Sequence, residues 1–323
     1  MKVLVTGGAG YIGSVCGEEL IRAGHEVVVW DNLSEGHRSA VPPQAVFLQG
    51  DLADRDLLQR AVQEHRPEAV IHFAGKALVP ESMRDPSSYY RVNVMGGIHL
   101  LDAMVSAGCR KIIFSSTCAT YGLPEKMPMD EQTPQKPINP YGHSKLVFEQ
   151  VLAWYAQIHG ILPTCLRYFN ASGASAERGE HHRVETHLIP NVLLTALGRR
   201  KEVEVFGENH ATPDGTCIRD YIHVKDLASA HILALGREKP GHFNVGTGNG
   251  YSVKQVIEVA RKVTKKEIPM RGQPARAGDP PALVASSHKL QRELGWKSNH
   301  SGLEEILTNA WDWHRAHPNG YAD

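Results

Sequence analysis

The sequence predicts an α/β protein in which a doubly wound parallel sheet is followed by a second, smaller α/β domain. In the first half of its 323 residues, short apolar runs rich in β-branched residues alternate with longer amphipathic stretches. Strands covered by helices on both faces have this nearly continuous apolar character, and their alternation with helices is typical of βαβ units with right-handed crossovers. After residue 170 the alternation loosens, and the polar, glycine-containing stretch 171–185 predicts a loop over a site.

The elements of the first domain follow from these two patterns. Continuous apolar runs such as KVLVT and EVVVW predict strands, and stretches with a helical period of apolar residues predict helices. The strands are expected at 2–6, 26–30, 46–49, 69–73, 111–115 and 163–168, and the helices at 12–23, 54–64, 87–107 and 141–159.

The second half contains the same two kinds of pattern at less regular spacing. We divide the chain into domains at 1–169 and 170–323, with a segment of about 217–245 returning to the first domain. Strands are expected at 202–206, 216–224 and 242–245, and helices at 188–197, 226–235, 253–263 and 302–314.

Composition and charge exclude several classes of protein. Lysine plus arginine and aspartate plus glutamate both number 35, so the basic excess typical of nucleic-acid binding is absent, and we expect no nucleic-acid partner. The apolar run Val3–Val5 is too short for a signal peptide, and no apolar segment approaches the roughly 18 residues of a membrane span. Five dispersed cysteines suit a reducing compartment, so we expect a cytoplasmic protein without a membrane partner.

A glycine-rich turn, TGGAGYIG, lies between the first predicted strand and the first helix. Glycines at 7, 8, 10 and 13 allow a tight turn, close approach of a pyrophosphate and close packing of helix on strand. The helix N-terminus offers N–H groups to the phosphates. Asp31 ends the second strand, where a carboxylate accepts hydrogen bonds from a ribose and favours NAD over NADP. The sequence therefore predicts a Rossmann domain that binds NAD.

Asp51 and Leu52 follow the third predicted strand. Asp51 could face the adenine of the dinucleotide, or it could cap the helix at 54–64, because aspartate commonly starts helices. The sequence leaves both interpretations open.

A tyrosine and a lysine stand four positions apart at the start of a helix, as Tyr141 and Lys145. This spacing puts both on one helical face, where an ammonium group lowers the pKa of a phenol and prepares it to accept a proton. Thr117 ends another strand and supplies a hydroxyl at the carboxyl edge of the sheet, where open α/β sheets bind ligands. The alternatives are a surface Lys145 and a Thr117 that only caps a turn.

Several longer motifs occur along essentially the whole chain. TGGAGYIGS, DNLS, HFAG, NPYGHSK, LRYFN, DGTCIRDYIHVKDL and HPNGY resemble the UDP-glucose 4-epimerases of the extended short-chain dehydrogenase/reductase family. The resemblance implies reversible 4-epimerisation of UDP-glucose and UDP-galactose through a 4-keto intermediate, with transient hydride transfer to tightly bound NAD.

The resemblance also implies roles for individual residues. Tyr141 would remove the proton of the sugar 4-hydroxyl, Lys145 would tune Tyr141 and bind the nicotinamide ribose, and Thr117 would hydrogen-bond the reacting oxygen. Asn170, Arg219 and Arg276 would contact the UDP moiety, Phe206 would line the uracil pocket and Asp279 would meet the uridine ribose. The expected cofactor-binding residues are Gly7, Gly10, Tyr11, Ile12, Gly13, Asp31, Asn32, Asp51, Leu52, Phe73, Ala74, Gly75, Asn93, Tyr141, Lys145 and Tyr168. The expected substrate-binding residues are Thr117, Tyr141, Asn170, His187, Leu188, Val205, Phe206, Arg219, Arg276, Asp279 and Leu283.

Two alternative functions are weighed against epimerisation. One is another NAD-dependent UDP-sugar-modifying enzyme; relatives that dehydrate or decarboxylate such sugars carry an acid after the strand hydroxyl, which the stretch STCATYG at 116–122 lacks. The other is an NAD-binding regulator without catalysis, which predicts a broken Thr117–Tyr141–Lys145 set, yet all three are present.

Three further expectations concern metals, substrate size and assembly. The cluster of His181, His182, Glu185 and His187 has donor groups for a metal, but we expect solvated or substrate-contacting residues and no metal. Leu283 takes a position where some family members carry a bulkier tyrosine, so we hypothesise that N-acetylated UDP-sugars also fit. The resemblance further implies a homodimer formed by helices of the cofactor domain.

Overall fold

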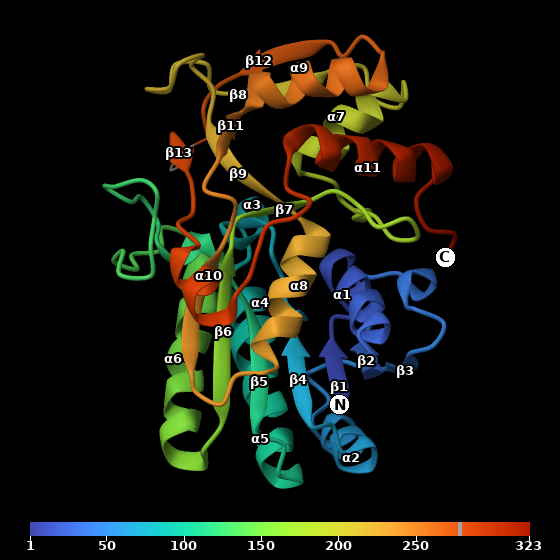
Figure 1. Ribbon diagram of the computed structural model, residues 1–323, viewed down its shortest axis with the longest axis vertical. Helices are drawn as coiled ribbons and strands as arrows, with labels where there is room; N and C mark the ends of the chain where they lie inside the picture. The colour runs from blue at the N-terminus through green and yellow to red at the C-terminus, as the bar shows by residue number, and fades with distance from the viewer. Residues whose placement is uncertain (277–279) are drawn as a thin grey trace.

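A seven-stranded parallel sheet is the largest element of the computed structural model, which describes residues 1–276 and 280–323. Every neighbouring pair of its strands is parallel. Figure 1 shows this sheet in the lower part of the molecule with helices on both sides. Across the sheet the order is β10 (Gly241–Val245), β6 (Leu162–Tyr168), β5 (Lys111–Thr117), β4 (Ala69–His72), β1 (Lys2–Thr6), β2 (Glu26–Asp31) and β3 (Val46–Gln49).

The strands of this sheet supply two separate hydrophobic cores, one on each face. Val3 and Val5 of β1 pack into one core, whereas Leu4 between them packs into the other, because successive side chains of a strand point to opposite faces. This double burial explains the continuous apolar runs in the sequence. Helices α1 (Tyr11–Arg22), α8 (Val224–Ala234) and α10 (His288–Leu294) cover the first face, and α2 (Arg55–His65), α5 (Gly97–Ala107) and α6 (Pro140–His159) cover the second.

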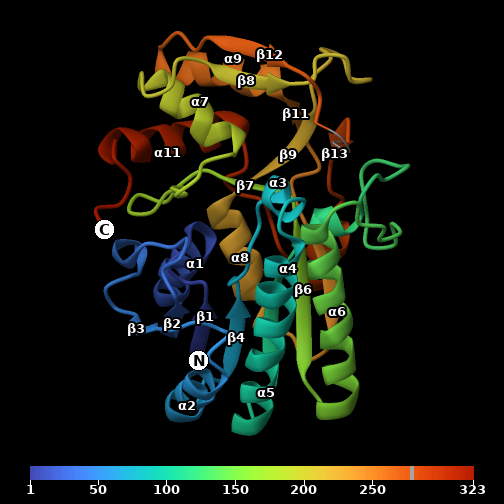
Figure 2. The same ribbon diagram turned by 180° about the vertical axis from the view of Figure 1, so that it is seen from behind.

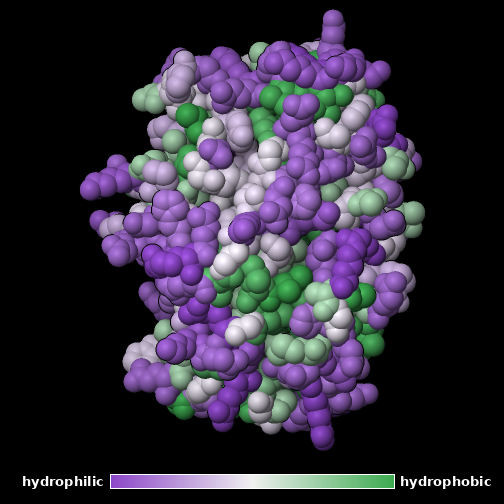
Figure 3. All heavy atoms as spheres, viewed as in Figure 1, coloured by the Kyte–Doolittle hydropathy of each residue, from purple (hydrophilic) through white to green (hydrophobic). Residues whose placement is uncertain are grey.

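Helix α8 leaves part of its apolar surface uncovered. Leu233 of this helix is 40% exposed. Figure 3 shows an apolar area in the middle of this face, where α8 lies in Figure 1.

Two smaller sheets and a third core form the upper part of the molecule in Figure 1. The central strand there is β9 (Ile218–His223), which pairs with β7 (Asn170–Ser172), β11 (Gly250–Ser252) and β13 (Ala282–Leu283). A separate ribbon joins β8 (Val203–Phe206) to β12 (Met270–Gln273). The third core is built with helices α7 (Leu188–Ala196), α9 (Val253–Thr264) and α11 (Leu303–Ala316).

The helix expected at 87–107 is confirmed as one unbroken helical run, but it is not α-helical throughout. The run consists of the short helix α4 (Pro86–Tyr89), the π-helical segment η2 (Tyr90–Gly96) and then α5. π-Helical turns are frequent at functional sites. Within η2, the buried Asn93 accepts a hydrogen bond from Lys76 N at 2.8 Å and donates one to Ser144 Oγ at 2.9 Å.

Several short elements were not predicted. The expected loop at 171–185 begins inside β7, where Ala171 and Ser172 pair with β9. Strands of two to four residues have too few alternating positions to produce a pattern, and their partners lie far away in the sequence. The other missed elements are η1 (Arg38–Ala40), α3 (Val79–Ser82), η3 (Cys118–Thr120), β11, β12, β13 and α10.

The predicted fold class, a doubly wound parallel sheet with flanking helices, is confirmed. In the part of the chain that the structure describes, none of the helices combines the length and the apolar character that crossing a membrane requires.

Candidate active site

The glycine turn between β1 and α1 is sterically restricted to glycine at two positions. Gly7 has φ of +72°, and a Cβ there would lie 2.5 Å from Ala74 N. A Cβ on Gly13 would lie 2.2 Å from Gly7 O. Gly10 stands at the N-cap of α1 and has no side chain with which to cap it. The first N–H groups of α1 are therefore left for a bound anion.

Asp31 is fixed beside this turn at the carboxyl end of β2. Its carboxylate accepts hydrogen bonds from Ala9 N at 3.0 Å and from Leu33 N at 2.8 Å. Burial raises the pKa of Asp31, and these two backbone N–H groups lower it in part. A carboxylate held at this place suits the hydroxyls of a dinucleotide ribose.

The structure tests one of the two interpretations of Asp51, that it caps the helix that follows. Helix α2 is capped by Asp54, whose side chain accepts a hydrogen bond from Leu57 N at 3.0 Å. Asp51 instead accepts hydrogen bonds from Asn32 Nδ2 at 2.7 Å and from Ala53 N at 2.8 Å. The capping interpretation is therefore wrong, and an adenine-side role for Asp51 stays a prediction.

Tyr141 lies in the first turn of α6, which Asn139 caps by accepting a hydrogen bond from Gly142 N at 2.8 Å. Thr117 ends β5, and its hydroxyl shares a hydrogen bond with Tyr141. Burial raises the pKa of Tyr141 to about 12, although the hydrogen bond with Thr117 lowers it. The structure thus brings the predicted phenol and hydroxyl into direct contact.

Lys145 lies one turn further along α6 and is 4% exposed. Its ammonium donates a hydrogen bond to Ser115 O at 3.0 Å and lies 5.0 Å from the ring centroid of Phe114. Burial lowers the pKa of Lys145 to about 8. The alternative of a surface lysine is therefore wrong. The expected lowering of the Tyr141 pKa by Lys145 is not seen in the protein alone, where burial raises this pKa and Thr117 is the group that lowers it.

Two of the predicted cofactor-binding residues, Gly75 and Asn93, lie close to Lys145. A Cβ on Gly75 would lie 2.9 Å from Asn93 Oδ1 and 3.3 Å from Lys145 Nζ, so both side chains lie close against Gly75. The hydroxyl of Tyr168 bonds Ser115 Oγ. The ring of Phe73 packs against the buried His231, with centroids 4.7 Å apart. These residues come from several different strands and helices, and together they line one edge of the sheet.

Comparisons with known proteins agree with this arrangement. The profile described as the NAD dependent epimerase/dehydratase family matches residues 3–246. The chain belongs to this family.

The chain also matches individual family members along its whole length. It is 48% identical over 329 residues to the UDP-glucose 4-epimerase of Lactobacillus helveticus, covering 100% of both chains. It is 46% identical to the UDP-glucose 4-epimerase of Brucella ovis solved in complex with NAD, with a TM-score of 0.93, covering 96% of this chain and 97% of that one. The Bifidobacterium longum UDP-glucose 4-epimerase solved with NAD+ and UDP is 37% identical, with a TM-score of 0.94 and coverage of 99% and 100%.

Family membership confirms the predicted NAD cofactor, and the residues of this chain fit it. The turn and the start of α1 form a cradle that carries no Cβ atom at Gly7, Gly10 and Gly13, so a pyrophosphate can approach the backbone there. The fixed carboxylate of Asp31 lies beside this cradle. Tyr11 and Ile12 open α1, and Tyr11 donates a hydrogen bond to Gly173 O at 2.6 Å. Leu52 and Ala74 pack in the second core of the large sheet. The contact of each residue with NAD stays a prediction.

The residues predicted to bind substrate come from the upper part of the molecule. Arg219 of β9 lies opposite Leu283 of β13 in register, and Asn170 at the start of β7 pairs with Tyr221 of β9. The guanidinium of Arg276 stacks over the ring of Phe206 at 3.9 Å from its centroid. Asp279 lies outside the described residues.

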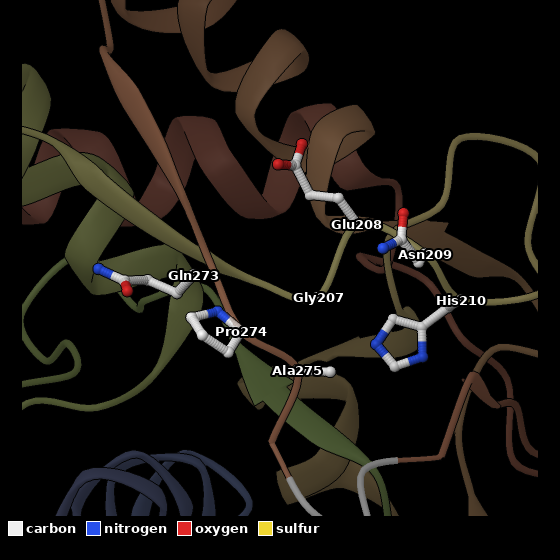
Figure 4. A pocket seen from close by; sticks show the side chains of 7 residues that line it. All are labelled: Gly207, Glu208, Asn209, His210, Gln273, Pro274 and Ala275. Atoms are coloured by element: carbon white, nitrogen blue, oxygen red, sulfur yellow. The ribbon is translucent and has the colours of Figure 1, made fainter.

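A pocket of about 310 Å³ opens next to Phe206 and Arg276. Figure 4 shows its two walls, formed by the segment that follows β8 and the segment that leaves β12. Val205 does not face it, because its side chain is 2% exposed in the third core, so any contact of Val205 with substrate uses its backbone. The lining residues are Gly207, Glu208, Asn209, His210, Gln273, Pro274 and Ala275.

His187 and Leu188 start helix α7, with His187 at the N-cap. Burial lowers the pKa of His187, but the carboxylates of Glu180 and Glu185 outweigh this effect and raise it to about 10. Contact of His187 and Leu188 with substrate remains a prediction.

Two buried polar groups next to the site were missed. Glu149 accepts hydrogen bonds from Ser116 Oγ at 2.5 Å and Arg167 Nε at 2.9 Å, directly behind Thr117. Glu149 follows Lys145 by four residues on α6, a spacing that places both side chains on one helical face. The sequence alone could therefore have indicated Glu149.

The second missed group is Asp220, next to Arg219 and fully buried. Its carboxylate accepts hydrogen bonds from Thr247 N at 2.9 Å, Gly248 N at 3.0 Å and Ala285 N at 3.1 Å. It therefore ties two loops to β9. These partners are distant in sequence, so the sequence shows the aspartate but does not indicate that it is buried or what it bonds.

Proposed function

We propose that this chain interconverts UDP-glucose and UDP-galactose by inverting the configuration at C4 of the sugar. The observation that carries the proposal is the contact between Thr117 and Tyr141 at the sheet edge where Lys145, Gly75 and Asn93 meet. The relatives in Lactobacillus helveticus, Brucella ovis and Bifidobacterium longum are named UDP-glucose 4-epimerases, and the last was solved with NAD+ and UDP. These names and the full-length similarity support the same activity here.

In this reaction Tyr141 accepts the proton of the sugar 4-hydroxyl and later returns it. Thr117 donates its single hydroxyl proton to the reacting oxygen once substrate replaces its hydrogen bond with Tyr141, while its side-chain oxygen keeps the one it accepts from Ala119 N at 3.1 Å. The pKa of Tyr141, about 12 in the protein alone, has to fall for this role, and the buried ammonium of Lys145 is the positive group of this chain that stabilises a phenolate. When bound, NAD+ supplies the acceptor and later the donor of the C4 hydride.

In this proposal, the predicted substrate-binding residues of the upper part of the molecule hold the UDP moiety. Arg219 and Arg276 supply planar cations that suit the diphosphate, and the pocket beside Phe206 accommodates the flat uracil ring. The residues that follow Thr117 are Cys118, Ala119 and Thr120, so no carboxylate stands where a dehydration would need one. This composition favours epimerisation over elimination.

The decisive experiment incubates the purified protein with UDP-galactose, without added NAD, and separates the products by chromatography. We expect UDP-glucose to accumulate to an equilibrium mixture. If the protein forms UDP-glucose only after NAD is added, the epimerase activity is supported but tight retention of the cofactor is contradicted. No product with bound NAD present would favour another UDP-sugar reaction or the non-catalytic regulator.

We also propose that two copies of the chain pair through α5 and α6. Figure 2 shows these helices side by side on the same face. Trp154 and Ile158 of α6 are 61% and 66% exposed, Met95 of η2 is 50% exposed and Val105 of α5 is 36% exposed. Exposed apolar residues gathered on one face are typical of an interface. Light scattering after size exclusion should give a dimer mass for the protein and a monomer mass for Trp154→Glu; a monomeric wild-type protein would refute the pairing.

A further inference from the structure

A cluster of two histidines and two glutamates lies in the segment between β7 and α7. One donor atom from each of Glu180, His182, Glu185 and His187 lies within 4.8 Å of all the others. His187 Nδ1 is 3.0 Å from Glu180 Oε1 and 3.2 Å from Glu185 Oε1, and His182 Nδ1 is 3.1 Å from Glu185 Oε2. Four side chains from one short segment therefore converge on one point.

The membership of this cluster differs from the sequence pattern. His181, which the pattern HHRVETH includes, turns away and stacks on His37, with ring centroids 4.7 Å apart. Glu180 takes its place. The cluster thus contains two imidazoles and two carboxylates, which are donor groups that zinc accepts in proteins.

The charge of the cluster requires compensation. The side chains of Glu180 and Glu185 are only 7% and 11% exposed, and buried carboxylates are stable only when a positive group or a metal neutralises them. The two arginines nearby in the sequence are engaged elsewhere: Arg178 pairs with Glu18 at 3.0 Å, and Arg183 donates a hydrogen bond to Ser34 O at 3.0 Å. Either two protonated imidazoles or one divalent cation between two neutral imidazoles balances the charge.

The separations between the histidine and glutamate donors are close to those of a tetrahedral metal site. Zinc binds imidazole nitrogen and carboxylate oxygen at about 2.0–2.2 Å, which places the ligand atoms of a tetrahedron roughly 3.3–3.6 Å apart. The four histidine–glutamate contacts, at 3.0 and 3.6 Å to Glu180 Oε1 and at 3.2 and 3.1 Å to the two oxygens of Glu185, lie close to that spacing. The widest separation is at most 4.8 Å, so a bound zinc ion would have to draw the donors together by about 1 Å or slightly more.

We propose that Glu180, His182, Glu185 and His187 bind one zinc ion as a structural site. Four protein ligands leave no open coordination position, which is typical of structural rather than catalytic zinc. The site would join the segment before α7 to the glycine turn, because the ring of His182 packs edge-on against Tyr11 of α1, with centroids 6.5 Å apart. Zinc therefore rigidifies the connection between the two parts of the molecule near the dinucleotide site.

The test measures zinc binding directly, on full-length protein without an affinity tag. The protein is stripped with EDTA, exchanged into metal-free buffer and titrated with Zn²⁺ in competition with a chromophoric chelator. We compare the wild type with Glu185→Gln and His182→Asn, and with His181→Asn as the matched control from the same segment. We expect one tight equivalent of zinc in the wild type and the control, and affinity weakened by at least about tenfold in the other two variants.

A second measurement, the melting temperature with and without zinc, distinguishes loss of the zinc site from poor folding of a variant. Zinc should raise the melting temperature of the stripped wild type and of His181→Asn but leave that of Glu185→Gln unchanged, because only a complete site gains stability from the ion. The proposal fails if the wild type binds less than one tight equivalent or gains no thermal stability. It also fails if both cluster variants bind zinc as the wild type does. Failure would leave the two histidines as protonated partners of the glutamates, and it would not affect the proposed epimerase activity.

Discussion

Replacing Tyr141 with phenylalanine tests the proposed chemistry most directly, because it removes one oxygen atom and keeps the ring. The Tyr141 hydroxyl shares a hydrogen bond with Thr117. A typical intramolecular hydrogen bond contributes about 0.5–1.5 kcal/mol to folding. Since native proteins are stable by about 5–15 kcal/mol, Tyr141→Phe should remain folded.

The effect on turnover should be larger than the effect on stability. A positioned general base contributes about 10²–10⁴-fold in rate, which corresponds to about 2.7–5.4 kcal/mol of transition-state free energy. Phenylalanine cannot accept the proton of the 4-hydroxyl, so kcat for UDP-galactose should fall by at least about a hundredfold. The neighbouring phenol of Tyr89 does not replace it, because the Tyr89 hydroxyl already donates a hydrogen bond to Leu78 O at 2.6 Å.

The assay measures kcat for UDP-galactose by product chromatography, together with the melting temperature and the NAD content of each preparation. Tyr155→Phe is the matched control, because the Tyr155 hydroxyl also makes a side-chain hydrogen bond, to Asp102 at 2.7 Å on α5. We expect the control to keep its activity with a similar loss of stability. A Tyr141→Phe protein that is folded, contains NAD and keeps more than about a tenth of the wild-type kcat would refute the role of Tyr141.

Three further predictions concern the cofactor cradle, the buried ion pair and the sugar pocket. Gly13→Ala should lose bound NAD, measured in the supernatant after denaturation, because its Cβ would lie 2.2 Å from Gly7 O; unchanged NAD content would contradict the cradle. Burial raises the pKa of Glu149, but Arg167 outweighs burial and holds that pKa below its ordinary value. The resulting stabilisation is present above the unfolded pKa of about 4.3 and is lost as pH falls through the folded pKa. Glu149→Gln should cost about 3–5 kcal/mol in urea unfolding at pH 7 and less at acid pH, and an equal cost at both would be inconsistent with this linkage. Leu283→Tyr should lower turnover of N-acetylated UDP-sugars and spare UDP-galactose, and equal losses on both would disprove the volume argument.

Local sequence was sufficient for the framework of the fold. The strands of the large sheet are buried on both faces, so each shows a continuous apolar run that needs no knowledge of its neighbours. The glycine turn and the pair Tyr141 and Lys145 are also local, because their spacing along one turn or one helical face already determines their geometry.

Other features depend on contacts between distant segments. The helix expected at 87–107 contains η2, where Asn93 bonds Lys76 and Ser144, and no local periodicity reveals those partners. The short strands around β9 exist only because each finds its partner across the fold.

The ionisation of the site and the membership of the histidine cluster were decided by tertiary structure alone. The sequence places Lys145 near Tyr141, but burial determines that the pKa of Tyr141 rises and that of Lys145 falls. In the same way, the sequence presents His181 and His182 as equal candidates, and only packing against His37 turns one of them away. Spacing along a chain determines which groups can share a face, whereas desolvation and side-chain direction depend on what the rest of the fold brings against them.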